Sequence, residues 1–404
     1  MIQYIVLILI VLILLFKLYV KITYKFWSYQ PVFHYHNILY WLSKPGIIMK
    51  ELPKINKFCN FTNIKVNDYH NYCDSDKNDI IKLIQNNYSN NKEYFPNIQL
   101  LDAHFSGHIN KNYVTVYRKD LHIAQDNIIN KIIAVITSRP VYIQLNNNIK
   151  FDAYYVDWLC VDKEYRKMNI APQMIQTHEY YQRHDNHNNF ISLFKKEGKL
   201  TGIVPLTAYN AYQYDPTTLK KEPLDDNYLI EINDKNYNDI DIMYKNQEFD
   251  CFIITSKSNI INLIKNNILR IFVLKNKDTI LAIYYFKNSY TTFKINQLYQ
   301  KDPKVCYSID IIGSIKFCDK LLFIKGFINA ILELKKKDLL ITIENISNND
   351  DLIDFLTKKQ LITRFKIPIA YFYYNYISKP IISNKVFILI KRTYFPALTN
   401  ESNT

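Results

Sequence analysis

The hydrophobic pattern of the chain begins with one long apolar run. Residues 2–16 are apolar except for Gln3, and three more apolar or aromatic residues follow Lys17. A run of about 19 residues is long enough to cross a bilayer as a helix. The sequence therefore predicts a membrane-spanning helix over residues 1–21.

A first series of strands and helices follows this run. Short apolar, β-branched runs separated by Asn and Asp clusters predict strands, and apolar positions at helical spacing predict helices. The predicted strands are 112–116, 131–135, 141–145 and 151–161, with a helical patch at 80–84 and a helix from residue 170. Pro172 lies in the first turn of that helix, where a missing N–H costs nothing. A meander of strands leading into a strand–helix unit is the layout of the acetyltransferase-like fold.

A second series of strands and helices follows a polar segment, 220–248, which we interpret as a connection between two halves. Its predicted strands are 252–254, 271–274, 280–286, 291–299, 339–343, 370–376 and 386–390, with helices at 321–335 and 352–356. We therefore expect an α/β fold with two similar halves, which suggests an internal duplication. The expected divisions are an anchor at 1–21, halves at 22–220 and 221–392, and an extension at 393–404.

The apolar run has two other interpretations, a cleaved signal peptide and a buried core helix. A signal peptide normally carries basic residues before its apolar core. Here no basic side chain precedes the core, and Lys17, Lys21 and Lys25 follow it. The positive-inside rule then places the body of the protein in the cytoplasm. We expect an uncleaved single-pass anchor through residues 2–20.

The segment 156–172 combines a buried strand, a short basic turn and the start of a helix. Free N–H groups and the helix dipole make such a helix start favourable for an anion. In transferases that use acyl-CoA, this anion is the pyrophosphate of coenzyme A. The alternative is an ordinary strand–helix unit with a solvated basic turn, and the segment alone does not decide between the two.

Composition and charge exclude several classes of function. The formal net charge is +14, but the lysines are scattered with no dense basic block, so we expect no nucleic-acid partner. The six glycines form neither a dinucleotide-binding nor a P-loop motif. No CxxC pair occurs, and His178 and His184 have the wrong spacing for HExxH, so we expect no metal site but a polar helix end with solvated histidines. The chain also has no GxSxG motif of a serine hydrolase.

Several motifs resemble those of the glycylpeptide N-myristoyltransferases, in the same order along the chain. KFWSYQPV at 25–32 is similar to the family's KFWxTQPV, and VDWLCVDK at 156–163 to E[IV]NFLCVHK. RKMNIAP at 166–172 is similar to RSKRxAP, and the stretch 365–389 to the family's last strands. The chain resembles a divergent member of the family, of viral or protist type. The resemblance implies two pseudo-symmetric acetyltransferase-like halves, with myristoyl-CoA bound by the first half and most of the peptide groove in the second.

The resemblance also implies roles for individual residues. The backbone N–H groups of Trp158 and Leu159, on a bulged strand, would form an oxyanion hole, and each such donor is typically worth about 3 kcal/mol in the transition state. Thr207, or Ala208 after a shift by one residue, would lie near the substrate amine. The cofactor-binding residues would be Tyr24, Lys25, Phe26 and Trp27 at the adenine end, and Arg166, Lys167, Met168, Asn169, Ile170 and Ala171 at the phosphates. Myristoyl-CoA would be the acyl donor, N-terminal glycine peptides the acceptors, and no cofactor would be bound permanently.

The chain departs from the family in the group expected to act as general base. The family uses its chain-terminal carboxylate, whereas here residues 391–404 follow the last matching strand. The family's KFGxGDG is absent from 359–369, and Asp157 and Asp162 replace the signature Asn and His. Our hypothesis is that Asp157 serves as the general base, against the alternative of a merely structural Asp. Two other functions stay open: acyl transfer with another chain or acceptor, and a degenerate, membrane-anchored binding protein.

Overall fold

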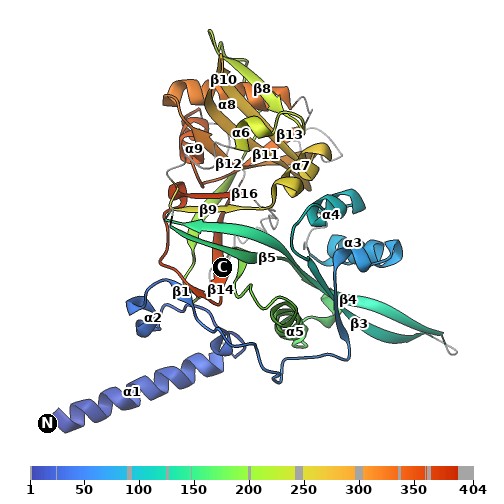
Figure 1. Cartoon of the computed structure of the whole chain (residues 1–404), viewed down its shortest axis with the longest axis vertical. Coiled ribbons are helices and arrows are strands. Elements are labelled where there is room, and N and C mark those ends of the chain that lie inside the picture. Colours follow the sequence, from blue (N-terminus) through green and yellow to red (C-terminus); the bar gives the residue numbers. More distant parts are fainter. Residues whose placement is uncertain are drawn as a thin grey trace.

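The structure is a computed structural model of the whole chain (Figure 1). It describes residues 2–23, 25–88, 93–123, 127–146, 148–198, 202–241, 249–295, 304–334, 338–359, 361 and 365–389. The helices are α1 (Ile2–Thr23), α2 (Ile38–Leu42), α3 (Asp74–Asn87), α4 (Ile98–Phe105), α5 (Ile170–Asp185), α6 (Asn238–Asp241), α7 (Lys257–Lys265), α8 (Lys320–Glu333) and α9 (Asn349–Lys358). The strands are β1 (Gly46–Ile47), β2 (Ile64–Asn67), β3 (Tyr113–Ile123), β4 (Asn127–Leu145), β5 (Ile149–Val161), β6 (Ser192–Glu197), β7 (Thr207–Tyr214), β8 (Tyr228–Ile232), β9 (Cys251–Ile254), β10 (Leu269–Asn276), β11 (Thr279–Ile295), β12 (Lys304–Lys316), β13 (Leu339–Glu344), β14 (Lys366–Tyr374), β15 (Tyr376–Ile377) and β16 (Val386–Leu389).

The two series of strands form one continuous sheet. Within the described residues this sheet has 14 strands, in the order β16-β9-β4-β5-β6-β14-β7-β13-β12-β11-β10-β8, and β3 also pairs with β4 and carries β2 on its other edge. The long strand β4 pairs with β3 along its first part and with β9 along its last part. Strands from the second half of the sequence therefore complete the sheet of the first half.

Helices cover both faces of the sheet around β4 and β5, because neighbouring side chains on a strand point to opposite faces. Val135 belongs to the core cluster of α3 and α4. Ile136, the next residue, packs in the cluster of Ile170 and Met174 from α5. In the second half α8 and α9 pack on β11, β12 and β13. The strand β5 is thus held between helices on its two sides (Figure 1).

Most predicted elements are present, and the α/β fold with an N-terminal apolar helix is confirmed. The prediction that 220–248 is only a connection was wrong, because β8 lies there and pairs with β10 at the sheet edge. The strands β1, β2, β6 and β12 and the helices α2, α4, α6 and α7 were missed. The alternative of a buried core helix at the N-terminus is also wrong. Over residues 3–23, whose burial the structure describes, Val20 is the one buried residue of α1, and the helix is apolar enough to cross a membrane by length and composition.

Candidate active site

The motif residues Trp158 and Leu159 lie on a β-bulge. The ladder between β4 and β5 pairs Val135 with Cys160 and Thr137 with Asp157, so two residues of β5 face Ile136 alone. Trp158 has a φ of 46°, an unusual conformation for a bulky residue. The bulge on β5, which the resemblance implied, is therefore present in the structure.

The indole of Trp158 stabilises this bulge. Its side chain is 1% exposed, and its ring centroid lies 5.0 Å from that of His104 and 5.7 Å from that of Phe105, both in α4. A strained backbone persists only where its surroundings fix it. Packing from α4 thus holds the backbone of residues 158–159 in place from one side of the sheet.

On its other edge β5 diverges from β6. The two parallel strands pair only from Tyr154 with Ser192 to Val156 with Phe194. Beyond this point β6 stays paired with β14 on its far edge, through residues 195–197. The gap between the strand ends gives access to backbone hydrogen-bonding groups that a ligand with amide groups can use.

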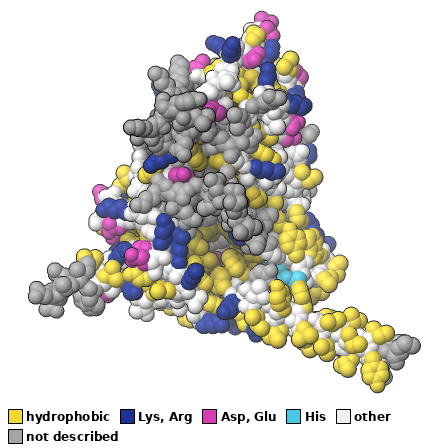
Figure 2. Space-filling view, turned by 180° about the vertical axis from the view of Figure 1, so that it is seen from behind, with side chains coloured by type: hydrophobic (Ala, Val, Ile, Leu, Met, Phe, Trp, Pro, Cys, Tyr) yellow, Lys and Arg dark blue, Asp and Glu magenta, His cyan; other side chains and the backbone are white. Residues whose placement is uncertain are grey.

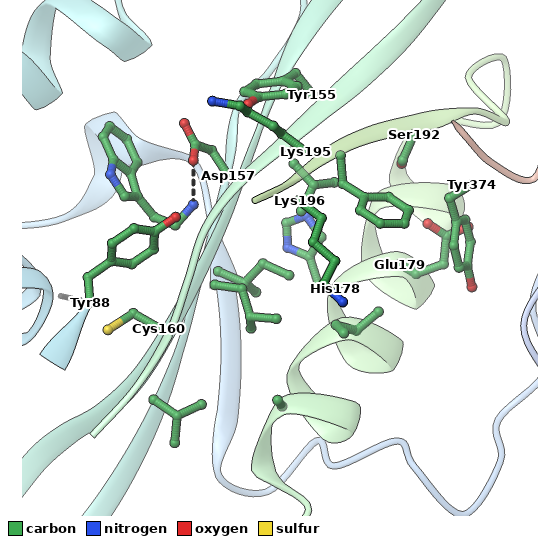
Figure 3. Close-up of a pocket in the computed structure, with 18 of the residues that line it drawn as sticks. Tyr88, Tyr155, Asp157, Cys160, His178, Glu179, Ser192, Lys195, Lys196 and Tyr374 are labelled. Carbon is green, nitrogen blue, oxygen red and sulfur yellow. Dashed lines mark hydrogen bonds between the residues drawn. The ribbon is translucent and has the colours of Figure 1, made fainter. Parts of the chain in front are cut away.

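A cavity of about 580 Å³ occupies this gap (Figure 3). It is bounded by the bulge of β5, the last residues of β6, the face of α5 and Trp27 from the segment after α1. Its lining is predominantly apolar with a few convergent polar groups, as is usual for ligand pockets. Within the described part of the chain, this cavity joins the sequence motifs at one site.

Asp157 lies beside the bulge at the cavity wall. Its Oδ1 accepts a hydrogen bond of 2.8 Å from the backbone N–H of Trp158, shown as the dashed line in Figure 3. The fully buried Arg139 is close enough to interact with the Asp157 carboxylate. Burial lowers the pKa of the Arg139 guanidinium, and the charge of Asp157 partly opposes this by raising it. Asp157 therefore carries two structural interactions at the point where chemistry was expected.

A second charged group lies on β6. The Nζ of Lys195 is 2.6 Å from Oε1 of Glu197 and 3.4 Å from Oε1 of Glu344, and all three side chains are nearly buried. Glu344 also accepts a hydrogen bond of 2.5 Å from the hydroxyl of Tyr209. This network connects β6 to β13 across two intervening strands, and Lys195 and Glu197 also line the cavity.

The helix α5 contributes His178 and Glu179 to the cavity wall (Figure 3). Both are buried, so the prediction of solvated histidines was wrong for His178. Burial lowers the pKa of His178 to about 3, and its Nδ1 lies 2.7 Å from the hydroxyl of Thr115. Burial raises the pKa of Glu179 to about 7, although Arg183, 3.6 Å away, lowers it in part.

The turn before α5 has a defined local structure. Arg166 donates from Nη2 to the backbone carbonyl of Asn87, at the end of α3, and from Nε to that of Val161. Lys167 and Asn169 both have positive φ, 65° and 58°, which brings the chain around to the first residue of α5. Arg166 thus ties the basic turn to α3, and its side chain lines the cavity.

The structure brings six of the predicted site residues together. Those lining the cavity are Trp27, Asp157, Trp158, Leu159, Arg166 and Ala171. Those that do not line it are Lys25, Phe26, Lys167, Met168, Asn169, Ile170 and Thr207, and Tyr24 lies outside the described residues. The side chain of Ile170 packs in the core, that of Phe26 packs edge-on against Phe58, and that of Thr207 is fully buried in β7.

Sequence reasoning missed several residues of the cavity. They are Asn87, Tyr88, His178, Glu179, Ser192, Phe194, Lys195, Glu197 and Tyr374. Glu179 follows His178 on a helix end that we predicted to be polar and solvated. Only the spacing of buried positions along α5 could have indicated that the Glu179 side chain points into the protein. The residues of β6 were missed because we did not predict that strand.

Two comparisons with known proteins agree with this geometry. A sequence model described as "Myristoyl-CoA:protein N-myristoyltransferase, N-terminal domain" matches residues 43–204. A crystal structure of Saccharomyces cerevisiae N-myristoyltransferase with bound myristoyl-CoA has a TM-score of 0.70 and 13% identity, over 91% of this chain and 99% of that one. A second structure of the yeast enzyme with bound myristoyl-CoA has a TM-score of 0.70 and 14% identity, over 91% and 94%.

The structural likeness shows that the fold is shared across nearly the whole chain. A comparison with curated protein sequences gives no match. Neither comparison tests the expected viral origin or the division of the chain at residue 220, which stay predictions. Among the described residues, no three His, Cys, Asp or Glu side chains gather as a set that could hold a metal ion.

Proposed function

Because this chain is a divergent member of the myristoyl-CoA:protein N-myristoyltransferase family, we propose that it transfers a myristoyl group from coenzyme A to the N-terminal glycine of proteins. The observation that carries this proposal is the cavity between the diverging ends of β5 and β6. It runs past the bulge at Trp158 and reaches Trp27, Arg166 and Ala171, three of the residues expected at the coenzyme.

The proposed binding mode follows from the two ends of this cavity. Arg166 and the start of α5 hold the phosphates, because a cation and free N–H groups both favour an anion there. Trp27, whose ring stacks 5.8 Å from that of Phe194, offers its indole to the adenine end. The pantetheine chain lies in the gap between β5 and β6, which places the thioester at the bulge.

The proposed reaction joins the glycine amine to the acyl carbonyl. The ammonium first loses a proton to a carboxylate, and the neutral amine then attacks the thioester carbon. The C–S bond breaks, coenzyme A leaves as a thiolate that takes up a proton, and an amide bond remains. The N–H groups of Trp158 and Leu159 stabilise the oxyanion, as preorganised donors do.

Asp157 is the proposed base, and its hydrogen bond to Trp158 gives it a second role. While Asp157 Oδ1 accepts from the Trp158 N–H, that N–H is engaged and does not serve a carbonyl oxygen. We infer that the thioester oxygen displaces the carboxylate, which frees it to face the incoming ammonium. A positioned carboxylate base contributes about 10²–10⁴-fold to the rate.

A degenerate acyl-CoA-binding protein is the second candidate. The observation that favours it is the same Asp157–Trp158 hydrogen bond, together with the Arg139 charge near that carboxylate. If the carboxylate stays in this place, the oxyanion hole lacks one of its two donors. A related transferase that takes another acyl chain or acceptor is distinguished from both candidates by its choice of substrate.

Binding is the first experiment. Titration calorimetry of the full chain in detergent with a non-hydrolysable myristoyl-CoA analogue is expected to give tight binding, and analogues with shorter and longer chains test the acyl length. Arg166→Glu is expected to weaken binding at least about tenfold, because it places a negative charge at the phosphates. Lys358→Glu in α9 makes the same charge change far from the cavity and serves as the matched control. If no acyl-CoA binds, both the transferase and the binding protein are excluded.

Turnover separates the two candidates. With a glycine-terminated peptide, Asp157→Asn is expected to lower kcat by about 10²-fold or more, because an amide cannot take up the proton of the ammonium. Asp152→Asn, an exposed position on the same strand, is the control and is expected to keep wild-type turnover. Wild-type protein that binds acyl-CoA but acylates no peptide would instead support the degenerate protein.

We also propose that α1 anchors the protein as a single membrane pass. Its length of 22 residues and its exposed apolar side chains support this, and the lysines at its C-terminal end favour a body on the cytoplasmic side. Protease protection of N- and C-terminal tags in membranes tests the topology. Protection of the C-terminal tag would contradict it.

A further inference from the structure

The short helix α2 carries an exposed apolar face. Ile38, Leu39 and Leu42 are 72%, 74% and 80% exposed. They lie at positions i, i+1 and i+4, so they share one side of the helix. Large apolar side chains gathered on one face usually mark a binding surface for a membrane or a partner.

The opposite face of α2 is fixed to the body of the protein. The ring of Trp41 lies 4.8 Å from that of Phe33, and its Nε1 donates to the carbonyl of Tyr35 at 3.0 Å. The Nζ of Lys379 lies 4.9 Å from the Trp41 ring centroid. Because these contacts hold the helix, its three apolar side chains stay turned outward.

The segment that carries α2 lies beside the predicted anchor. The ring centroids of Phe16 in α1 and His36 are 5.6 Å apart. Phe16 precedes the last residue of α1, Thr23, by seven positions, which is about 10 Å along a helix. The chain therefore turns back after α1 and returns toward the level at which the anchor enters a bilayer. Figure 1 shows α2 on the same side of the body as α1.

The charge around α1 and α2 is strongly positive. Residues 17–57 contain seven lysines and one glutamate, a net charge of +6. All seven lysines are exposed: Lys17, Lys21, Lys25, Lys44, Lys50, Lys54 and Lys57. Figure 2 shows hydrophobic side chains along α1 and on the body directly beside it, with basic side chains near its base. Lysines near a membrane surface attract anionic lipid by about 1 kcal/mol each.

We propose that the face of Ile38, Leu39 and Leu42 forms a second contact with an anionic bilayer surface, beside the anchor α1. The exposed tyrosines Tyr29 and Tyr35 suit the interface, where aromatic rings with a polar tip are enriched. The contact restrains how the body sits on the membrane. Since Trp27 lies between α1 and α2 in sequence and lines the cavity, the cavity then opens close to the lipid surface.

The test places a tryptophan on this face of the full chain. Leu42→Trp is made with Trp41 kept, because Trp41 holds α2, and the protein is reconstituted in nanodiscs of phosphatidylcholine and phosphatidylglycerol. The control carries Ile109→Trp, because Ile109 is 91% exposed between α4 and β3. Trp27, Trp41 and Trp158 are present in both proteins, so the added tryptophan is measured as the difference from wild type.

The expected result is a blue-shifted emission at position 42 that lipids brominated in their acyl chains quench, and no added quenching at position 109. Exchange of phosphatidylglycerol for phosphatidylcholine is expected to reduce the quenching at position 42. An unquenched, water-like emission at position 42 would overturn the proposal. So would an emission shift that needs high protein density and resists the brominated lipids, because a second copy of the chain would then cover α2.

Discussion

Glu179 is a carboxyl group whose charge state depends on the cavity it lines. Burial raises its pKa to about 7 from the ordinary 4.5, so it is largely neutral at pH 6 and charged at pH 8. A charged carboxylate disfavours both an acyl chain and the anionic coenzyme. We expect the affinity for acyl-CoA to fall several-fold as the pH rises from 6 to 8, up to about tenfold for one unit of pKa change on binding.

The measurement is calorimetry with the myristoyl-CoA analogue at several pH values. The coenzyme phosphate also titrates in this range, so the comparison is between wild type and Glu179→Gln. The variant is expected to lose the part of the pH dependence that Glu179 causes. The same slope in both proteins would show that Glu179 does not contact the bound ligand.

The buried His178 is expected to make the stability of the fold sensitive to acid. Burial lowers its pKa to about 3, against 6.5 in an ordinary histidine, so between these values only the unfolded chain binds the proton. The stability it contributes is therefore present above pH 6.5 and is lost as the pH falls, by about 1.4 kcal/mol per unit. His108, whose pKa is lowered to about 4, acts in the same direction, whereas Glu179 acts in the opposite direction between pH 4.5 and 7.

Urea unfolding at pH 7 and pH 5 measures this dependence. His178→Gln is expected to lower stability at pH 7, because the Thr115 contact changes, but to lose less between the two pH values than wild type. An unchanged pH dependence in this variant would assign the acid sensitivity to other groups.

At the scale of elements, the contact of α8 with the sheet depends on one glycine. A Cβ added at Gly326 would lie 2.6 Å from the hydroxyl of Tyr284 and 3.0 Å from a methyl group of Leu274. That hydroxyl donates to the Phe323 carbonyl at 2.6 Å and has little room to move. Gly326→Ala is therefore expected to destabilise the fold by about 1–3 kcal/mol, although alanine is the better helix former.

Denaturant unfolding checks this prediction with two companions. Gly46→Ala adds the same methyl group where the nearest atom outside residues 45–47, the carbonyl oxygen of Lys44, is 3.9 Å away, and it is expected to be nearly neutral. Adding Tyr284→Phe to Gly326→Ala removes the clashing oxygen and is expected to recover part of the loss. Equal effects of the two glycine substitutions would contradict the packing argument.

At the scale of the whole molecule, the continuous sheet predicts that both halves unfold together. Phe387 of β16 is fully buried and packs 5.2 Å from the ring of Phe252, in β9, and 5.3 Å from that of Tyr285, in β11. All three residues belong to the second half of the sequence, but β9 pairs with β4 of the first half, so Phe387 lies where the two halves meet. Phe387→Ala is expected to cost about 3–5 kcal/mol, and to shift the unfolding of both halves equally.

The unfolding of each half needs its own probe. Trp158 fluorescence reports on the first half, and hydrogen exchange of β11 and β12 amides reports on the second. Phe317→Ala, at an exposed phenylalanine, is the control and is expected to have little effect. Separate midpoints for the two probes would show that the halves unfold independently.

The site could be predicted from sequence in part, and the limit has a physical cause. The bulge at Trp158 and the turn at Arg166 were predicted because each is formed by consecutive residues, whose motif is visible in the sequence. Glu179 and Lys195 were missed because their position in the cavity depends on where α5 and β6 lie relative to β5. Thr207, expected near the substrate amine, has a fully buried side chain in β7, which the sequence did not indicate.

The sequence by itself determined the apolar N-terminal helix, the order of most strands and helices, and the strand–turn–helix at the proposed coenzyme site. These features rest on periodicity and on backbone geometry within short segments, which the chain specifies directly. Only the tertiary structure decided that both halves share one sheet and that Asp157 engages the Trp158 N–H. It also decided that α2 lies beside α1. Such features depend on contacts between residues far apart in the chain, and those contacts exist only after the segments have packed.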